Sequence, residues 1–372
     1  MICKKEDCTG CFACYNICPK NAINMKEDEY GYIYPEIDKY KCINCNLCKK
    51  VCPSVKLIKL FKSQKALAMW NNDNNIRKTS TSGGIATTLY KFILKKNGII
   101  YGCSNSVEDK FPFVRIDKIQ DLHKVQGSKY VHAYINDTYR KVKEDLEEKK
   151  DVMFIGTPCQ VAGLKNFLQK EYRNLYTADI ICHGVPSQKL LKDEILYKLG
   201  KIKNAKVTFR ENGNFCIRVY ESGNLVLDEM QDKNFYFLGF MKSLFYRENC
   251  YTCRYANSNR VGDLTLGDFW GIGKANSENK YEKEEKNGIS VCLVNTEKGE
   301  KLIDNIKGEC YLEERSISEA IDGNAQLRSP AIKNKEYDKF KKLYVVSGYK
   351  VARKKCLKKD KFKQKLKKLM RK

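Results

Sequence analysis

Eight cysteines near the start of the chain repeat one spacing twice. Each copy has three cysteines two residues apart, a fourth three residues later, and then a proline: Cys8, Cys11, Cys14, Cys18 and Pro19, followed by Cys42, Cys45, Cys48, Cys52 and Pro53. Three closely spaced thiolates can hold three corners of a [4Fe–4S] cubane, and in two-cluster proteins the fourth ligand comes from the other copy. The spacing therefore predicts a ferredoxin-like module with two cubanes that carries electrons.

Exchange of the fourth ligand between the copies assigns four cysteines to each cluster. The two sets are Cys8, Cys11, Cys14 and Cys52, and Cys42, Cys45, Cys48 and Cys18. Zinc and disulfides are the alternatives. Zinc sites favour C-x2-C pairs with a long spacer, and disulfide frameworks suit small secreted domains, so cubanes are the better interpretation. Cys3 lies outside the repeat and is expected to be a plain thiol.

The bulk properties indicate a large protein of a reducing compartment. Its 372 residues leave room for two or three domains. The cysteine repeat follows the first residues directly, so we expect no secretory signal, and no stretch approaches the roughly 20 apolar residues of a membrane span. Eighteen cysteines without a signal indicate metal ligation in the cytoplasm.

The charge of the chain is strongly positive, at +25, and much of it lies in the last residues. The segment 351–372 holds twelve Lys or Arg and one Asp. Such a segment can bind an anionic membrane surface, here the inner face, or a polyanion. A solvated helix in a lysine-rich chain is the alternative. No nucleic-acid recognition motif accompanies the charge, so we expect no nucleic-acid partner.

The order of patterns predicts an α+β protein in three parts. We expect a two-cluster ferredoxin module over 1–60, a larger mixed α/β domain over 61–345 and a basic helical tail over 346–372, with a linker at 54–65. Alternating strand and helix patterns in the large domain are typical of α/β units. They predict a helix that begins after Gly84, strands at 99–101, 152–155, 175–181 and 289–294, helices at 161–168 and 297–306, and an antiparallel meander with turns at Asn212-Gly213 and Ser222-Gly223.

Four cysteines of the large domain could hold a third cubane. Cys159 and Cys182 each follow a predicted strand, where α/β folds place ligand sites. Cys250 and Cys253 form a C-x2-C pair. Buried cysteines are also common core residues, so the spacing alone leaves both interpretations open.

A series of motifs in the large domain occurs in an order that resembles a known family. The series is Thr81-Ser82-Gly83-Gly84, Gln126-Gly127-Ser128-Lys129-Tyr130-Val131, Gly156-Thr157-Pro158-Cys159-Gln160, Cys182, Cys250-x2-Cys253 and Gly262-Asp263-Leu264-Thr265-Leu266-Gly267-Asp268. Over roughly residues 65–330 it is similar to the coenzyme F420 hydrogenase/dehydrogenase beta-subunit family, in which an added N-terminal ferredoxin module is a known arrangement.

The resemblance implies FAD and one [4Fe–4S] cluster in the large domain. The implied cluster ligands are Cys159, Cys182, Cys250 and Cys253. The implied flavin-side residues are Thr81, Ser82, Gly83, Gly84, Gln126, Gly127, Ser128, Lys129, Tyr130, Gly156, Thr157 and Pro158. A Gly-rich turn before a helix exposes N–H groups to a pyrophosphate. Lys129 could offset phosphate or flavin charge and His183 could relay protons, whereas a surface lysine and a structural histidine are the plain alternatives.

One departure from the family concerns the electron acceptor. Where F420-using members have small residues, this chain has Asp268-Phe269-Trp270-Gly271. A tryptophan there would occupy space over the flavin, which argues for an acceptor other than F420. His123 and His132 have no motif around them and receive no role.

Together these features predict an iron–sulfur flavoprotein oxidoreductase. Electrons from a redox protein or partner subunit would pass through the cubanes to FAD, which would exchange an electron pair with a small diffusible substrate, F420-like or other. The alternative is an electron-transfer subunit without its own substrate, serving a partner enzyme such as one of surface-polysaccharide synthesis. A cluster-bearing sensor or scaffold is the third class, and oligomerisation stays open.

Overall fold

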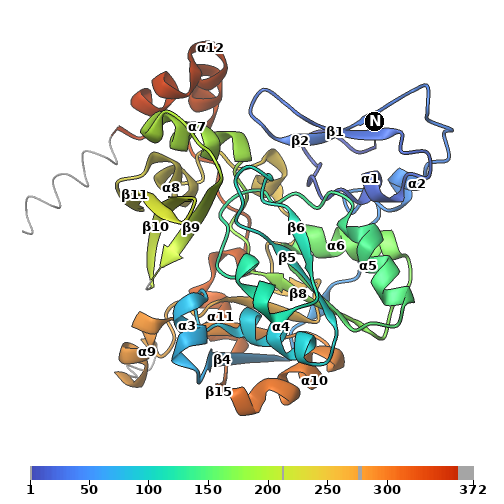
Figure 1. Ribbon diagram of the computed structural model, residues 1–372, viewed down its shortest axis with the longest axis vertical. Helices are drawn as coiled ribbons and strands as arrows, with labels where there is room; N and C mark the ends of the chain where they lie inside the picture. The colour runs from blue at the N-terminus through green and yellow to red at the C-terminus, as the bar shows by residue number, and fades with distance from the viewer. Residues whose placement is uncertain (1, 212, 275–278, 359–372) are drawn as a thin grey trace, which may run out of the picture.

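A computed structural model describes residues 2–211, 213–274 and 279–358. Its centre is one eight-stranded sheet (Figure 1). In order across the sheet the strands are β15 (Cys310–Arg315), β4 (Lys65–Asn71), β14 (Ser290–Val294), β13 (Leu264–Asp268), β8 (Leu175–Ile180), β7 (Val152–Gly156), β5 (Ile99–Cys103) and β6 (Phe113–Ile116). The middle four, from β13 to β5, run parallel, and the outer pairs are antiparallel.

Helices cover both faces of this sheet because its central strands are apolar on both sides. Met153 and Ile155 of β7 pack in the core beneath α4 (Ile85–Lys95) and α10 (Glu297–Ile306). Val152 and Phe154, which alternate with them, pack on the opposite side with α5 (Thr138–Glu147) and α6 (Pro158–Leu168). The structure confirms the three helices expected after Gly84, around 161–168 and at 297–306. It also confirms all four strands expected from apolar runs.

The N-terminal module lies against one end of the α5–α6 layer (Figure 1). It contains α1 (Ala13–Ile17), the antiparallel pair β1 (Ile23–Glu27) and β2 (Ile33–Ile37), and α2 (Leu47–Lys50). The guanidinium of Arg140 on α5 donates to the backbone carbonyls of Tyr15 and Asn16. The stretch expected as a linker is instead anchored, because β3 (Phe61–Lys62) pairs with β12 (Asn259–Arg260) and Ile58 packs on the core.

A second, smaller layer carries the meander that the sequence predicted. Strands β9 (Ala205–Glu211), β10 (Asn214–Glu221) and β11 (Asn224–Met230) form it, and α7 (Gln188–Leu199), α8 (Phe235–Met241) and α12 (Tyr337–Lys355) pack around it. Asn212, in the first expected turn, lies outside the described residues. The remaining elements are α3 (Asn74–Thr79), α9 (Glu282–Asn287), α11 (Ile317–Gly323) and the 3-10 turns Ile119–Lys124, Glu248–Thr252, Asn279–Tyr281, Lys307–Glu309 and Ala325–Leu327.

The start of the expected basic tail is part of this layer. Helix α12 kinks at Gly348, where φ is 77°, and Tyr349, Ala352 and Cys356 beyond the kink are buried in the apolar core beside α7 and α8. Residues 359–372, which carry most of the expected tail, lie outside the described residues. Within the part of the chain that the structure describes, helices are too short or too polar to cross a membrane.

A buried ion pair fixes β8 to β13 just behind the cysteines. Asp179 on β8 is fully buried and accepts hydrogen bonds from the Arg260 guanidinium, from the Thr265 hydroxyl and from two backbone N–H groups, those of Val261 and Gly262. Arg260 is 1% exposed. Because Cys182 follows Asp179 by three residues, this network sets the direction in which the chain leaves the sheet.

We predict that Asp179→Ala lowers the free energy of unfolding by about 3–5 kcal/mol, because it leaves the Arg260 charge buried without its partner. Urea unfolding of the full chain measures this. The matched control is Asp304→Ala, which removes an exposed partner of Lys307 and should cost about 0.5 kcal/mol or less. Equal losses in the two variants would contradict the prediction.

Candidate functional site

The two cysteine copies share the same backbone geometry. Gly10 and Phe12 in the first copy and Asn44 and Asn46 in the second occupy equivalent places, and all four have a left-handed backbone, with φ between 54° and 64°. Left-handed residues turn a chain sharply, and glycine and asparagine adopt this conformation most readily. The repeat in sequence therefore produces two loops of the same shape, each able to wrap three thiols.

The first cysteine set lies inside the protein. Cys8, Cys11, Cys14 and Cys52 are all buried, and Cys3 lies beside them with its thiol hydrogen-bonded to Cys8 and Cys52. This hydrogen bond is the main reason that the pKa of Cys8 falls to about 6, and the Arg247 guanidinium lowers it further. Burial raises the pKa of Cys11 to about 12. Cys3, expected to be a plain thiol, thus borders two of the expected ligands.

The second set faces outward. Cys45 is exposed, and Cys18, Cys42 and Cys48 are half-buried. Partial burial raises the pKa of Cys48, and the neighbouring thiols of Cys45 and Cys18 raise it further, so these three sulfurs lie close together. The exchange of fourth ligands between the two copies stays a prediction.

A third set of four cysteines lines one cavity at the carboxyl edge of the sheet. Cys159 begins α6 directly after β7, Cys182 follows β8, and Cys250 and Cys253 come from the 3-10 turn at 248–252 and the residue after it. Thr157 caps α6 through a reciprocal capping box with Gln160, which fixes the position of Cys159 between them. The third set is thus brought together from three separate segments.

The chemistry of this cavity suits a cubane. Burial raises the pKa of Cys159 and of Cys182 to about 12 and that of Cys250 further, and the thiols raise one another's pKa values. No three His, Cys, Asp or Glu side chains among the described residues converge on a single ion. In a cubane, however, each thiolate binds a different iron, so four separated thiols around one apolar cavity fit that group.

The first and third sets meet at a closely packed seam. On α6, Gly163 contacts Cys11, and a Cβ at this glycine would lie 3.0 Å from the Cys11 sulfur. The thiols of Cys11 and Cys159 are near enough for Cys159 to raise the pKa of Cys11, although burial is the larger cause. Buried Arg247 and His132 complete the seam on its other side, both against Gly10.

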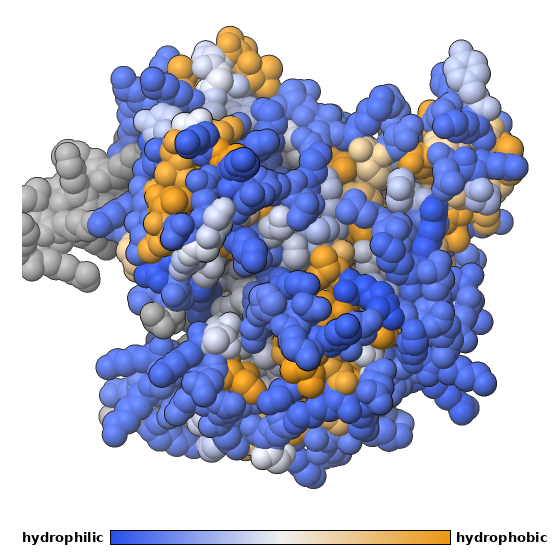
Figure 2. Space-filling model, in the orientation of Figure 1, coloured by the Kyte–Doolittle hydropathy of each residue, from blue (hydrophilic) through white to orange (hydrophobic). Residues whose placement is uncertain are grey.

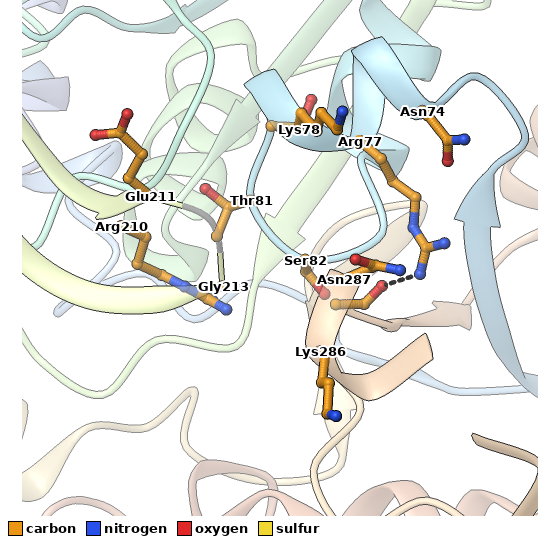
Figure 3. A pocket seen from close by; sticks show the side chains of 12 residues that line it. Asn74, Arg77, Lys78, Thr81, Ser82, Arg210, Glu211, Gly213, Lys286 and Asn287 are labelled. Atoms are coloured by element: carbon orange, nitrogen blue, oxygen red, sulfur yellow. Dashed lines mark hydrogen bonds between the residues drawn. The ribbon is translucent and has the colours of Figure 1, made fainter. Parts of the chain in front are cut away.

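A separate cationic hollow lies where the flavin-side motif was expected. Figure 3 shows Arg77 of α3 and Arg210 of β9 approaching the Thr81–Ser82 loop from opposite sides. The hollow has a volume of about 160 Å³. Arg77 Nε, Arg210 Nε and the Ser82 hydroxyl are buried there without hydrogen-bond partners among the described residues. Both guanidinium charges are already paired, Arg77 with Glu284 and Arg210 with Asp268, so what the hollow offers an anion is hydrogen bonds from the two Nε–H groups and the Ser82 hydroxyl. The volume suits a diphosphate rather than a whole dinucleotide.

The backbone N–H groups of Gly83 and Gly84, which were expected to face a pyrophosphate, are used inside the protein. The Gly83 N–H donates to the Ser290 hydroxyl and the Gly84 N–H to the Thr81 carbonyl, so neither N–H is open to a pyrophosphate. A Cβ at Gly83 would lie 2.2 Å from the Met69 carbonyl oxygen. Gly83 is therefore required for close approach to β4, and the groups open to an anion are side chains.

The Gln126–Tyr130 segment lies next to this loop, as the resemblance implied. The Ser128 N–H donates to the Thr81 hydroxyl at 2.9 Å, and the Gln126 amide donates to the Thr79 hydroxyl. The Lys129 ammonium donates to three carbonyls of its own loop, those of residues 125–127, and burial lowers its pKa to about 8. Lys129 thus closes the loop on itself and does not line the hollow.

An aromatic group fills the space between the hollow and the third cysteine set. The Tyr130 ring packs 4.9 Å from Phe240 and 6.1 Å from Phe215, measured between ring centres. Phe215 in turn stacks on Trp270 at 6.1 Å, and His183, which lines the cysteine cavity, lies 6.5 Å from Phe240. Thr157 and Pro158 also line the cysteine cavity, and Gly156 ends β7 beside it.

The charges beside this aromatic group are paired. Arg210 donates to both carboxylate oxygens of Asp268, at 2.9 and 2.7 Å, and lies over the Phe215 ring. Burial lowers the pKa of His183, and Asp268 partly opposes this. Trp270 is 42% exposed, so it stands at the rim of this region.

Comparison with known families agrees with this arrangement. Residues 66–138 match the model of the coenzyme F420 hydrogenase/dehydrogenase beta subunit N terminus, and residues 149–320 match that of its C terminus. Residues 7–55 match the 4Fe-4S dicluster domain. The chain belongs to the coenzyme F420 hydrogenase/dehydrogenase beta-subunit family, and it is an iron–sulfur oxidoreductase subunit with an N-terminal dicluster domain.

Individual relatives are distant. The beta subunit of F420-dependent formate dehydrogenase from Methanocaldococcus jannaschii is 24% identical over 289 residues, which are 74% of this chain and 68% of that one. The coenzyme F420-dependent sulfite reductase of the same organism is 25% identical over 86% of this chain, which spans only 48% of that protein. The F420-reducing [NiFe] hydrogenase complex from Methanosarcina barkeri aligns with 71% of this chain and 91% of its own, at 18% identity and a TM-score of 0.46.

Several site residues had no signal in the sequence. Arg77, Arg210 and Arg247 are single arginines outside any motif, and only the fold brings them to the hollow and the seam. Cys3 had a weak signal, since it lies five residues before the first ligand. His123, left without a role, is exposed and bonds its own turn.

We predict that Gly163→Ala destabilises the protein by about 1–3 kcal/mol, because the added methyl group overpacks the seam against Cys11 and the Tyr139 hydroxyl. Thermal unfolding under anaerobic conditions, with acid-labile sulfide measured in parallel, checks this. Gly308→Ala is the control, since a Cβ there meets nothing within 4 Å. Indistinguishable melting temperatures and sulfide contents for the two variants would refute the packing argument.

Proposed function

We propose that this chain is an iron–sulfur flavoprotein subunit that transfers electrons between a redox protein and a small two-electron substrate. One observation carries the proposal. Three cysteine sets follow one another from an exposed thiol at Cys45, through the buried set at Cys11, to the cavity at Cys159. Cubanes held in this order would supply one-electron chemistry, and the order leads from solvent to the carboxyl edge of the sheet.

The third set is proposed to hold a [4Fe–4S] cluster with Cys159, Cys182, Cys250 and Cys253 as ligands. Two facts support this: the four thiols line one cavity, and its lining is mainly apolar. Cluster assembly would take up the thiols as thiolates. The raised pKa values of these thiols mean that this step releases protons.

The cationic hollow is proposed to hold the diphosphate of FAD. Arg77, Arg210, Ser82 and Thr81 supply hydrogen bonds for it. A bound flavin collects electrons singly and passes them in pairs. Tyr130 and Phe215 supply an aromatic surface between the hollow and the cysteine cavity. His183 lines the cysteine cavity and lies beside Phe240 of the aromatic group, and we propose that it holds a proton there.

The substrate is proposed to be a diffusible two-electron carrier. Relatives whose names include F420 make an F420-like molecule one candidate. Trp270 at the rim argues instead for an acceptor other than F420 itself. An electron-transfer role without a substrate of its own remains the second candidate, because several relatives are named as subunits. We propose that the protein works in the cytoplasm.

The outer cysteine set is proposed as the place where the redox partner binds. Tyr40 and Ile43 beside Cys42 are exposed, and Figure 2 shows apolar side chains among charged ones at the outer edge of this module. The exposed lysines around them are Lys39, Lys41, Lys49 and Lys50. An apolar centre with a basic rim suits an acidic electron carrier.

We predict about twelve irons and one FAD per chain after anaerobic purification, four irons for each of three cubanes. Cys182→Ser should reduce the iron to about eight and leave the flavin in place, because the hollow does not contain Cys182. Iron, acid-labile sulfide and released flavin are measured together, with Cys216→Ser, a buried cysteine of the meander, as control. Eight irons in the unchanged chain would refute the third cluster, and lack of FAD after reconstitution would refute the flavin.

We predict that Arg210→Met weakens FAD binding about tenfold or more, since a hydrogen bond to a charged group contributes about 1.5–3 kcal/mol. Equilibrium titration with FAD measures the dissociation constant while the iron content stays unchanged. Arg173→Met, at an exposed arginine, is the control. Equal FAD affinity in the two variants would place the diphosphate elsewhere.

A further inference from the structure

Arg247 is a fully buried arginine without an acidic partner on its free nitrogens. It is 0% exposed, and Nη1 and Nη2 have no hydrogen-bond partner among the described residues. Only Nε is used, donating to the Cys8 carbonyl at 2.6 Å. An unpaired buried charge costs several kcal/mol, so a negative group must lie against this guanidinium in the working protein.

The position of Arg247 shows which groups these are. Its Nε–H donates to the Cys8 carbonyl, and its backbone carbonyl accepts from the Cys250 N–H. Its guanidinium lies beside Gly10 together with His132, which lines the cavity of the third set. Cys8 belongs to the first set, and Cys250 belongs to the third. The side chain therefore lies between the first set, near the start of the chain, and the third set, in the large domain.

The surroundings hold Arg247 in this place. Its backbone N–H donates to the Val185 carbonyl, and its own carbonyl accepts from the Cys250 N–H. The Tyr34 ring of the N-terminal module covers the guanidinium at 4.2 Å, and Gly10 leaves room for it, since a Cβ there would lie 3.2 Å from Nη1. Neither the backbone nor the neighbouring rings leave this arginine free to turn toward solvent.

We propose that Arg247 is a positioning residue whose fixed charge is shared by the first and third clusters and raises the reduction potential of both. A cluster gains a negative charge when it takes up an electron, and hydrogen bonds and net charge near its sulfurs set its potential. One cation between two clusters favours the reduced state of each. The part that concerns the third cluster rests on the proposed function.

The test is a redox titration of the full chain, followed by electron paramagnetic resonance. We expect Arg247→Gln to weaken reduction of both inner clusters at least tenfold, which for one electron is 59 mV toward lower potential. Arg247→Lys keeps the charge and should retain most of the wild-type potential. Arg140→Gln is the control, because Arg140 donates to the carbonyl of Cys18 in the outer set and should leave the inner potentials in place.

Three outcomes would overturn the inference: unmoved potentials in Arg247→Gln with full iron, a shift of only one inner cluster, or an equal shift in Arg247→Lys. Iron content is measured on every sample, so a missing third cluster is seen independently as about eight irons in the unchanged chain. Should Arg247→Gln fail to assemble clusters, Tyr34→Leu removes the ring that covers the guanidinium without removing its charge. Water then screens that charge, and both potentials should shift in the same direction as in Arg247→Gln.

Discussion

The packing of Cys11 against Gly163 determines how the two halves of this protein work together. Helix α6 begins with the cysteine cavity at Cys159 and, one turn later, presents a residue without a side chain to the N-terminal module. Any larger residue would separate the first and third thiol sets. The hydrogen bonds of Arg140 and the seam around Arg247 hold the same two surfaces together from either side. Under the proposed function, electrons passing between the halves would cross at this contact, because it is where the first and third thiol sets come together.

The central sheet explains why the chemistry gathers at one edge. Strands β7 and β8 are parallel neighbours, so their carboxyl ends deliver Cys159 and Cys182 to the same place. Asp179 fixes the next strand, β13, through the Thr265 hydroxyl, and Arg260 of β12 pairs with the same carboxylate. Strand β13 ends at Asp268, which accepts from the Arg210 guanidinium. The cysteine cavity is thus built at the ends of neighbouring strands of this sheet, whereas the cationic hollow lies between α3, the loop at 80–82 and β9 of the meander. The aromatic group around Tyr130 separates the two.

The sequence predicted those parts whose signal is local. The cysteine repeat, the strand that ends at Gly156 and the helix 297–306 follow from spacing and apolar periodicity, and the structure has them at those positions. The Thr81 and Ser128 motifs could be recognised only by resemblance, and their hydrogen bond is a tertiary contact. Arg247 could not be predicted, because a single arginine carries no pattern and its role depends on residues more than 200 positions away. The resemblance assigns Gly83 and Gly84 to phosphate binding, whereas the close approach of Gly83 to β4 already explains why that residue is glycine.

Because Cys45 is exposed, the outer cysteine set is the part of the N-terminal module that dissolved oxidants reach most easily. Oxidants reach sulfur and iron through solvent, and accessible thiolates react first. The outer set is open at Cys45, while the first set, Cys8, Cys11, Cys14 and Cys52, is buried. Damage would therefore begin at the outer loop and spare the interior. A partly oxidised molecule would keep its brown colour and its folded core but would have lost its connection to other proteins, so colour is a poor guide to whether a preparation is intact.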